Sequence, residues 1–311
     1  MNLPHLTEAQ APLTCDVSVI DECGEQISVS IPAERALTVY VDKRELVTLM
    51  TLGARPELLV LGYLLNQRLV KEVNEIESIT VDWDVGAAAV KTRSGIADIE
   101  EKTARRVVTT GCGQGSVFGG LMDEVEQIKL PPDCRITQSQ LYQLVNTIRL
   151  KETTYKSAGS VHACALFDLN VSTGSEPDML IFVEDVGRHN AIDTIAGWMA
   201  MNVAPTLDAS FIGLSASNVA FKAPSEAPVE KDAPSSRLAF YTTGRLTSEM
   251  VIKSAQMGVA IVVSRSGITQ MGHEVAAAVG LCAIGRATNK RFVCYTSAQR
   301  LLWQPELLAT H

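Results

Sequence analysis

The pattern of apolar and polar positions predicts an N-terminal part built from strands and one helix. From Gln26 onward, ISVSIPAE and ALTVYVDKREL alternate apolar and polar residues, as half-buried antiparallel strands do. RPELLVLGYLLNQRLV follows with leucines at helical spacing, and Pro56 and Glu57 suit a first helical turn. ESITVDWDVGAAAVKTR and ARRVVTT return to strand-like patterning. Residues 1 to about 20 are expected to form a loosely held tail.

The pattern changes after Leu130-Pro131-Pro132. A helix is expected to start at Thr137, with Gln140 at the capping-box position. Its buried face would carry Leu141, Leu144, Val145 and Ile148. Five short apolar runs come next: HACALFDL, MLIFVE, LAFYTTG, VAIVVS and LCAIG. Helical stretches are expected at Asn190 to Met199, Thr247 to Met257 and Thr269 to Val279. Apolar strands alternating with helices predict an α/β layer with a largely parallel sheet.

Two domains follow from these patterns. Residues 1–135 are expected to form a smaller N-terminal α+β domain, and residues 136–311 an α/β domain. The segment SNVAFKAPSEAPVEKDAPSSR, residues 217–237, interrupts the second pattern with three prolines. Such a segment is typical of an exposed loop insertion.

Composition narrows the class of protein. The 311-residue chain has a net charge of -8, which argues against a nucleic-acid partner. No apolar run approaches the roughly 18 residues of a membrane span, and the N-terminus lacks the basic start and apolar core of a signal peptide. Seven cysteines, an odd number without a C-x-x-C pair, predict a reducing cytoplasm and no structural zinc.

One glycine-rich stretch, VVTTGCGQGSVFGG, is the first candidate for chemistry. Cys112 stands between Gly111 and Gly113, with Arg105 and Arg106 upstream. Nearby positive charge favours the thiolate, the reactive form of cysteine, although a small buried cysteine in a turn is an open alternative. A dinucleotide fingerprint is rejected, because its third glycine would come one position too early and Gly-Gly interrupts the helix that should follow.

Glycines and cations follow the predicted strands. MLIFVE leads into Gly187 and Arg188, LAFYT into Gly244 and Arg245, and VAIVVS into Arg265. LCAIG leads into the longest such segment, Arg286, Ala287, Thr288, Asn289, Lys290 and Arg291. Ligands of open α/β sheets bind outside the carboxyl ends of the strands, and guanidinium groups bind phosphate in a bidentate way. These positions therefore predict a phosphate-binding pocket, although strand-end loops are polar in any α/β protein.

Two histidines are candidate site residues. Asp185, His189 and Asp193 have the four-residue spacing of one helix face, which suits either a general base with its orienting carboxylate or a structural helix start. A structural or ligand-contact role is favoured for His189. His162 fits either a core or a pocket position. The absence of H-x-E and P-C-x-x-C argues against zinc-dependent deamination.

Four segments resemble the formate dehydrogenase accessory protein (FdhD) family. The most specific is VEDVGRHNAID, and the others are LLVLGYLLNQRLV, TTGRLTSEMVIKSAQMGV and RFVCYT, all in the family's order between about residues 20 and 298. The resemblance implies a C-terminal domain with a cytidine-deaminase-like fold that lacks the zinc chemistry.

The same resemblance implies a function. Family members are cytoplasmic sulfurtransferases, typically homodimers. They take persulfide sulfur from a cysteine desulfurase and pass it to the molybdenum bis(molybdopterin guanine dinucleotide) cofactor, as formate dehydrogenase activity requires. By this resemblance Cys112 carries the persulfide. The nucleotide ends would be held by Gly244, Arg245, Arg188, His189 and the segment Arg286 to Arg291, where a guanine nucleotide could also bind.

The chain departs from the family pattern at two places. The usual loop C-G-x-C-G has Gly115 in place of its second cysteine, and Cys134 is the nearest substitute in sequence. The family's T-G-G-x-H appears as Ala158 to His162 without the Thr and one Gly. Two alternatives therefore remain: a cofactor-binding chaperone without sulfur transfer, and a nucleotide hydrolase that uses His189 and Asp193.

Overall fold

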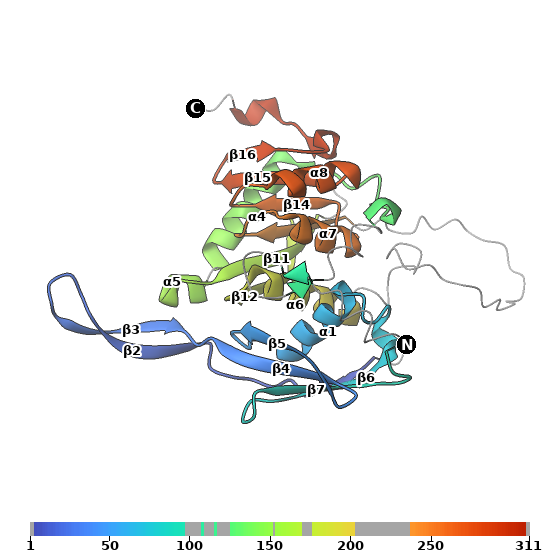
Figure 1. The fold of residues 1–311 in the computed structure, drawn as a ribbon. Helices are drawn as coiled ribbons and strands as arrows, with labels where there is room; N and C mark the ends of the chain where they lie inside the picture. The colour runs from blue at the N-terminus through green and yellow to red at the C-terminus, as the bar shows by residue number, and fades with distance from the viewer. Residues whose placement is uncertain are drawn as a thin grey trace, which may run out of the picture.

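The computed structural model describes residues 3–96, 107–108, 115–116, 125–151, 153–169, 176–202 and 237–308. Cys112 and residues 217–236 of the expected insertion lie outside these ranges. The described residues form a mixed α/β structure with several sheets, as the sequence pattern predicted. Figure 1 shows the two larger sheets one above the other, with helices α1 (Pro56–Asn66) and α6 (Arg188–Asn202) between them.

The first sheet has five strands in the spatial order β1-β6-β7-β4-β5. Its parallel pairs are β1/β6 and β4/β7, and its antiparallel pairs are β6/β7 and β4/β5. Apolar side chains from one face, among them Leu37, Val39 and Ile79, are buried against α1. The strands are β1 (His5–Leu6), β4 (Arg35–Val41), β5 (Arg44–Thr51), β6 (Ile76–Asp82) and β7 (Ala87–Thr92).

The N-terminal segment is not the loosely held tail that its pattern suggested. β1 pairs with β6, and Glu57 Oε1 accepts hydrogen bonds of 2.7 Å from Thr7 Oγ1 and from the Ala9 amide. Residues Thr14–Ile20 form β2, antiparallel to β3 (Gln26–Pro32). The partners of residues 5–9 lie about 50 to 75 positions further along the chain, so local patterning carries no sign of them.

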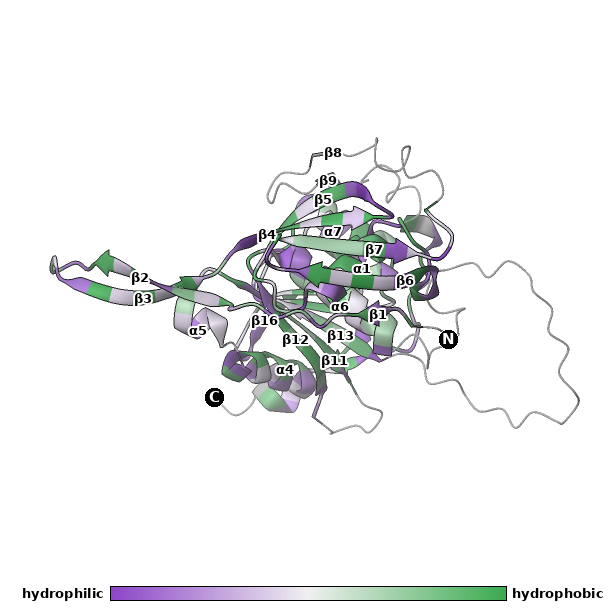
Figure 2. Ribbon diagram, turned by 90° about the horizontal axis from the view of Figure 1, so that it is seen from below, coloured by the Kyte–Doolittle hydropathy of each residue, from purple (hydrophilic) through white to green (hydrophobic). Residues whose placement is uncertain are grey.

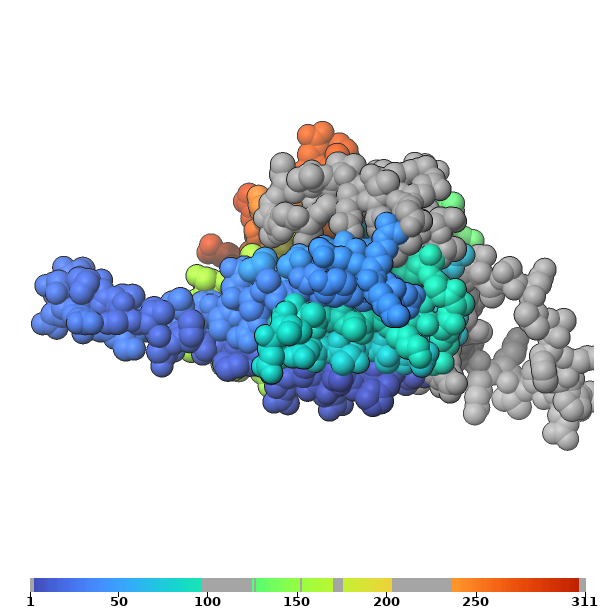
Figure 3. All heavy atoms as spheres, turned by 60° about the horizontal axis from the view of Figure 1, so that its bottom comes forward, coloured from blue at the N-terminus to red at the C-terminus, as the bar shows by residue number. Residues whose placement is uncertain are grey.

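β2 and β3 form a two-stranded ribbon that projects from the body of the molecule (Figures 1 and 3). The cross-strand pairs Val17–Val29 and Val19–Ile27 place apolar residues on one face of the ribbon. At its turn the amides of Cys23 and Glu25 both donate to Asp21 Oδ1 at 2.9 Å. The ribbon is an exposed arm with no place in the core clusters formed by the described residues.

The second sheet has six strands in the order β12-β11-β13-β14-β15-β16. Only β13/β14 and β14/β15 are parallel pairs, while β11/β12, β11/β13 and β15/β16 are antiparallel. The expectation of a largely parallel sheet was therefore wrong, because the consecutive strands β11 and β12, and likewise β15 and β16, pair antiparallel. The strands are β11 (His162–Asp168), β12 (Asp178–Asp185), β13 (Leu238–Thr242), β14 (Ile261–Ser264), β15 (Cys282–Thr288) and β16 (Arg291–Cys294).

Helices cover both faces of this sheet. On one face α6, α7 (Ser248–Gln256) and α8 (Gln270–Ala278) pack on side chains such as Leu166 and Phe240. On the other, α4 (Gln138–Lys151) packs on Phe167 and Tyr241. Strands buried on both faces are apolar along their length, as Figure 2 shows for β11, β12 and β13.

The start of α4 is as the sequence predicted. Gln140 Oε1 accepts from the Thr137 amide at 3.0 Å, and Thr137 Oγ1 accepts from the Gln140 amide at 3.1 Å, which is a reciprocal capping box. Leu141, Leu144 and Ile148 are buried.

The remaining elements are the short strands β8 (Val107–Val108), β9 (Gly115–Ser116), β10 (Ile136–Thr137) and β17 (Leu301–Leu302), helix α5 (Thr154–Ala158), and the 3-10 helices η1 (Val73–Glu75), η2 (Val125–Gln127), η4 (Ala298–Arg300) and η5 (Pro305–Leu308).

Helices α1 and α6 join the two halves of the molecule through a glycine contact. A Cβ atom on Gly62 would lie 1.7 Å from the Asp193 carbonyl oxygen, and one on Gly197 would lie 2.0 Å from the Leu58 carbonyl oxygen. The helices therefore touch backbone to backbone, which only glycine permits.

The division of the chain into two domains at residue 135 stays a prediction. No helix within the described ranges is both long and apolar enough to cross a membrane.

Candidate functional site

The predicted cations lie along one edge of the six-stranded sheet, the edge formed by the carboxyl ends of four of its strands. β12 and β13 each run antiparallel to β11, and β14 and β15 run parallel to β13, so four strands end at this edge. Arg188 follows β12 and Gly244-Arg245 follows β13. Arg265 follows β14 and lies with its Cζ 5.4 Å from the ring centre of Tyr155. The strand-end convergence expected from the sequence is thus present.

Arg188, Arg245, His162 and His189 come together at this edge. A Cβ on Gly244 would lie only 2.7 Å from Arg188 Cδ, so the arginine packs directly on the glycine. His162 begins β11 beside the end of β12. Burial lowers the pKa of His162, and the positive charges of Arg188 and Arg245 lower it further. Cations surround an imidazole that is held neutral.

His189 is held neutral more strongly. Burial lowers the pKa of His189 to about 2, with contributions from Lys253, Arg188 and His162. Its side chain is 6 % exposed, and its Nε2 lies 3.4 Å from Glu249 Oε2 without a hydrogen bond to any described residue. A buried neutral imidazole can still donate or accept one hydrogen bond at that nitrogen.

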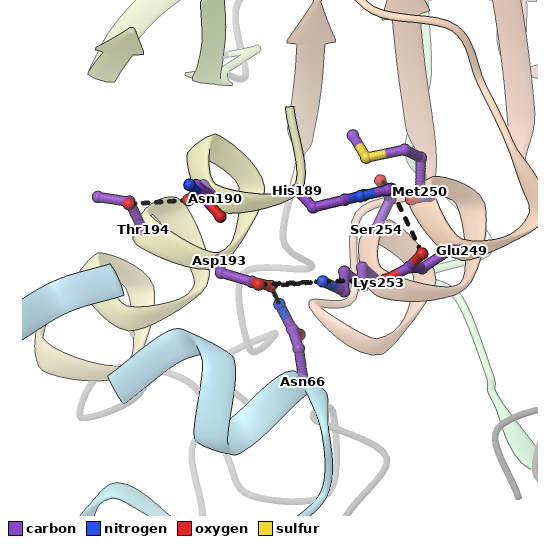
Figure 4. A network of polar contacts seen from close by, with 9 residues as sticks. All are labelled: Asn66, His189, Asn190, Asp193, Thr194, Glu249, Met250, Lys253 and Ser254. Atoms are coloured by element: carbon purple, nitrogen blue, oxygen red, sulfur yellow. Dashed lines mark hydrogen bonds and ion pairs between the residues drawn. The ribbon is translucent and has the colours of Figure 1, made fainter. Parts of the chain in front are cut away.

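A network of buried charged side chains lies next to His189 at this edge. Lys253 Nζ lies 2.9 Å from Asp193 Oδ1 and 3.4 Å from Glu249 Oε1, and Asn66 Nδ2 donates to Asp193 Oδ1 at 2.7 Å. Figure 4 shows Asp193 between Asn66 of α1 and Lys253 of α7, with Glu249 and His189 next in line. Burial acts against ionisation of Lys253, but Asp193 and Glu249 together outweigh it and raise its pKa. The ammonium therefore stays charged inside the protein.

Asp185 does not share a helix face with His189 and Asp193, because it lies in β12 whereas they lie in α6. Asp185 ends β12 and accepts hydrogen bonds from Thr51 Oγ1 (2.5 Å), Asn190 Nδ2 (2.9 Å) and the amides of Gly187 and Leu52. Asp193 is occupied by Lys253 and Asn66. Neither carboxylate orients His189, so the hydrolase alternative loses its catalytic pair.

The segment Arg286 to Arg291 occupies the same edge two strands away. Since neighbouring strands lie about 4.8 Å apart, β15 is about 10 Å from β13. The Arg286 amide donates to the Ser266 carbonyl at 2.6 Å, and Asn289 and Lys290 turn the chain into β16. Arg286, Thr288, Asn289, Lys290 and Arg291 are exposed. Ala287 is 1 % exposed and packs in the core, so its side chain faces away from any ligand at this edge.

Cys134 is placed poorly for the substitute role that its sequence position suggested. Its Sγ lies 3.8 Å from the carbonyl of Leu238, at the start of β13 and hence at the opposite edge of the sheet. The side chain is fully buried, and burial raises its pKa to about 11. Cys112 lies outside the described residues.

Sequence reasoning missed Asn66, Glu249 and Lys253. Glu249 and Lys253 stand four residues apart within the predicted helix, a spacing usually found on solvated helix faces. Their burial arises from α6 packing on α7, which no local pattern reports. Within the described ranges, no cluster of three or more His, Cys, Asp or Glu is placed to hold a metal ion.

These features define a two-sheet α/β protein whose six-stranded sheet carries cations and neutral histidines at one edge. Helices α6 and α7 begin at this edge, so the positive ends of their dipoles point toward it. The chain belongs to the FdhD/NarQ family, whose family model matches residues 32–216 and 227–302. The family expected from VEDVGRHNAID is therefore confirmed.

Individual relatives match almost the whole chain. It is 27% identical over 299 residues to the sulfur carrier protein FdhD of Bacillus licheniformis, with 96% of this chain and 98% of the relative covered. It is 27% identical over 274 residues to the protein of the same name from Bacillus subtilis, covering 86% and 88%. A crystal structure assigned as a formate dehydrogenase accessory protein of Desulfotalea psychrophila aligns with a TM-score of 0.64 and 21% identity, over 94% of this chain and 100% of that one.

Proposed function

We propose that this protein is a sulfur carrier that serves a formate dehydrogenase. It accepts persulfide sulfur from a cysteine desulfurase on Cys112 and delivers the sulfur to the molybdenum bis(molybdopterin guanine dinucleotide) cofactor, its substrate. The names of the Bacillus relatives support the sulfur-carrier role. The observation that carries the cofactor part is the gathering of Arg188, Arg245, His162 and His189 at one sheet edge.

This edge suits the pyrophosphates of the substrate. Guanidinium groups bind phosphate oxygens through paired, charge-assisted hydrogen bonds. Arg188 is 5 % exposed and backed by Gly244, so its position is fixed before a ligand arrives. The exposed segment Arg286 to Arg291, about 10 Å along the edge, suits the second nucleotide of an extended ligand. A free guanine nucleotide would occupy part of the same surface.

Cys112 is the proposed sulfur acceptor. Its thiolate attacks the terminal sulfur of the desulfurase persulfide; the sulfur–sulfur bond breaks, the desulfurase cysteine leaves as a thiolate, and Cys112 holds the persulfide. Arg105 and Arg106 support the thiolate form, and flanking glycines leave the approach open. Exchange of this type depends on the thiolate fraction and on access. The protein is expected to act as a cytoplasmic homodimer.

Mass spectrometry tests the sulfur step. The protein is incubated with a cysteine desulfurase and cysteine, and its peptides are mapped. One added sulfur atom on the Cys112 peptide, removed by reductant, is expected for the wild type and for Cys134→Ser, and none for Cys112→Ser. A Cys112→Ser chain that still supports full formate dehydrogenase activity in cells would end the proposal.

A cofactor-carrying chaperone without sulfur transfer is the second candidate. The observations that favour it are Gly115 in place of the second loop cysteine and the burial of Cys134 at the far edge of the sheet. It requires tight guanosine diphosphate binding that Cys112→Ser leaves unchanged, together with an unmodified Cys112 after desulfurase treatment. The same mass measurement therefore separates the two candidates.

A further inference from the structure

The β15–β16 hairpin carries one cysteine on each strand. Cys282 begins β15 and Cys294 ends β16, and both side chains face the layer of α4. Their Sγ atoms lie 3.9 Å apart, and both thiols are free. Cys282 has no solvent exposure, whereas Cys294 is half-buried on the edge strand of the sheet. A buried and an accessible thiol are thus in contact.

We propose that Cys294 and Cys282 form a thiol–disulfide exchange site. Cys294 is the attacking thiol, Cys282 is the resolving thiol, and the oxidant is a low-molecular-weight disulfide of the glutathione class. In a reducing compartment such a pair is a transient, responsive link rather than a permanent crosslink.

The surroundings assign the two roles. The hydrogen bond from Cys282 lowers the pKa of Cys294, as does the Thr296 backbone, while burial opposes them. The same hydrogen bond and burial raise the pKa of Cys282. Access agrees with this order, because the Cys294 side chain is partly exposed whereas Cys282 is fully buried. A small disulfide can therefore reach Cys294 but not Cys282.

The reaction balances without further reagents. The Cys294 thiolate attacks one sulfur of the small disulfide, its sulfur–sulfur bond breaks, and one small thiolate leaves. Cys282 then loses its proton and attacks Cys294 Sγ, which expels the second small thiolate. Two cysteines lose two electrons and two protons in total, and the small disulfide gains them as two thiols.

The geometry permits this bond after a small movement. Cys294 is paired with Ile284, so Cys282 is its diagonal neighbour across the hairpin. The sulfurs must approach by about 2 Å to reach a bond length of about 2.0 Å. The Tyr295 amide donates to the Ala283 carbonyl at 2.8 Å and holds the backbone beside Cys294, so the approach of the sulfurs comes from rotation about the two Cα–Cβ bonds.

The bond would close the hairpin that presents Arg286 to Arg291. Restricting the conformation of this turn would change the affinity of the cationic edge for an anionic ligand. That consequence rests on the proposed function, whereas the disulfide itself does not. Its formation is measured at Cys282 and Cys294, and sulfur transfer is measured at Cys112, so failure of one leaves the other standing.

Peptide mapping after treatment with oxidised glutathione tests the proposal. Arg286, Lys290 and Arg291 separate the two cysteines, so trypsin releases them on different peptides. The wild type should yield these peptides joined, two hydrogens lighter than their sum. Cys282→Ser should keep one glutathione on Cys294, and Cys294→Ser should leave Cys282 unmodified.

Cys134→Ser is the matched control, because it removes a buried thiol of the same core and should leave the joined peptides unchanged. The exposed Cys15 and Cys23 report within each sample that the reagent has acted. Glutathione on Cys15 and Cys23, with Cys282 and Cys294 both still alkylated as free thiols after unfolding, would overturn the proposal. Modification of Cys282 in Cys294→Ser would overturn the assigned roles.

Discussion

Lys253 Nζ lies 2.9 Å from Asp193 Oδ1, and neither side chain has any solvent exposure. Asp193 belongs to α6 and Lys253 to α7, and Asn66 of α1 donates to the same carboxylate at 2.7 Å. The Asp193 carboxylate therefore ties α1, which packs on the first sheet, to two helices of the second sheet. Next to it, His189 and Glu249 lead to the cationic edge.

Removing the Lys253 ammonium should lower the free energy of unfolding by far more than the Lys253–Asp193 pair contributes to it. In Lys253→Met, Asp193 keeps a buried charge with only an amide donor, a situation that typically destabilises by about 3–5 kcal/mol. Urea unfolding measures the loss. Lys253→Met combined with Asp193→Asn should recover a large part of it, because the second change removes the stranded charge and keeps an acceptor for Asn66.

Lys91 provides the control for that experiment. Its ammonium lies 2.7 Å from Glu77 on the surface, with 64% of the lysine side chain exposed. Solvent screens such pairs, so Lys91→Met should cost less than about 1 kcal/mol. Equal losses for the two lysine variants would contradict a buried, charged Lys253.

Acidification should destabilise the protein through His189. Its pKa is lowered to about 2 in the fold by burial, against about 6.5 in the unfolded chain. Between these values the unfolded state binds one more proton, so stability falls as the pH falls below about 6.5. At pH 5 the loss from this group alone is about 2 kcal/mol. His162, whose pKa burial also lowers, adds in the same direction.

Unfolding free energies of His189→Gln measured between pH 7 and 5 isolate this contribution. The variant should show a shallower fall than the wild type, whatever its absolute stability at pH 7. His273→Gln, on the exposed surface of α8, should keep the wild-type slope. Parallel curves for wild type and His189→Gln would show that the imidazole titrates normally in the fold.

Local patterning predicted most helices and strands but not how they pair. α1, α4 and five of the six strands of the second sheet lie near where the sequence placed them, because apolar periodicity reports burial directly, whereas β16 was not predicted as a strand. β1 and β2 were missed, and the second sheet is mixed rather than largely parallel. Strand order depends on contacts between distant segments, which a single pattern does not encode.

In the candidate site, too, the sequence predicted the local features but not the contacts between distant segments. Arg188, Gly244 and Arg245 were predicted to meet because the carboxyl ends of strands share an edge, and they do. The alternative in which Asp193 orients His189 is not supported, because Asp193 pairs with Lys253, which lies 60 residues away on another helix. Ala287 was included with its neighbours by motif, but strand alternation turns its side chain into the core.

Gly62→Ala should separate α1 from α6. The new Cβ would lie 1.7 Å from the Asp193 carbonyl oxygen, which is backbone and cannot rotate away. The gain in helix propensity, about 1 kcal/mol, cannot offset this overlap, so we expect a net loss of at least about 2 kcal/mol in urea unfolding. In Gly267→Ala the nearest atom is Tyr295 Oη at 4.0 Å, and the change should be near neutral. A stable Gly62→Ala protein would contradict the backbone contact.

Gly244→Ala should weaken ligand binding more than it weakens the fold. The added methyl carbon would lie 2.7 Å from Arg188 Cδ and 3.2 Å from Arg188 Cβ, so the arginine must swing out of the edge. Losing a charge-assisted contact costs about 1.5–3 kcal/mol, which is a fall of roughly 10- to 150-fold in affinity for guanosine diphosphate by titration calorimetry. Arg188→Ala should give a similar fall, and the double variant little more, because both changes remove one interaction. Additive losses would mean that Gly244 meets the nucleotide itself, and unchanged affinity in all three variants would remove Arg188 from the site.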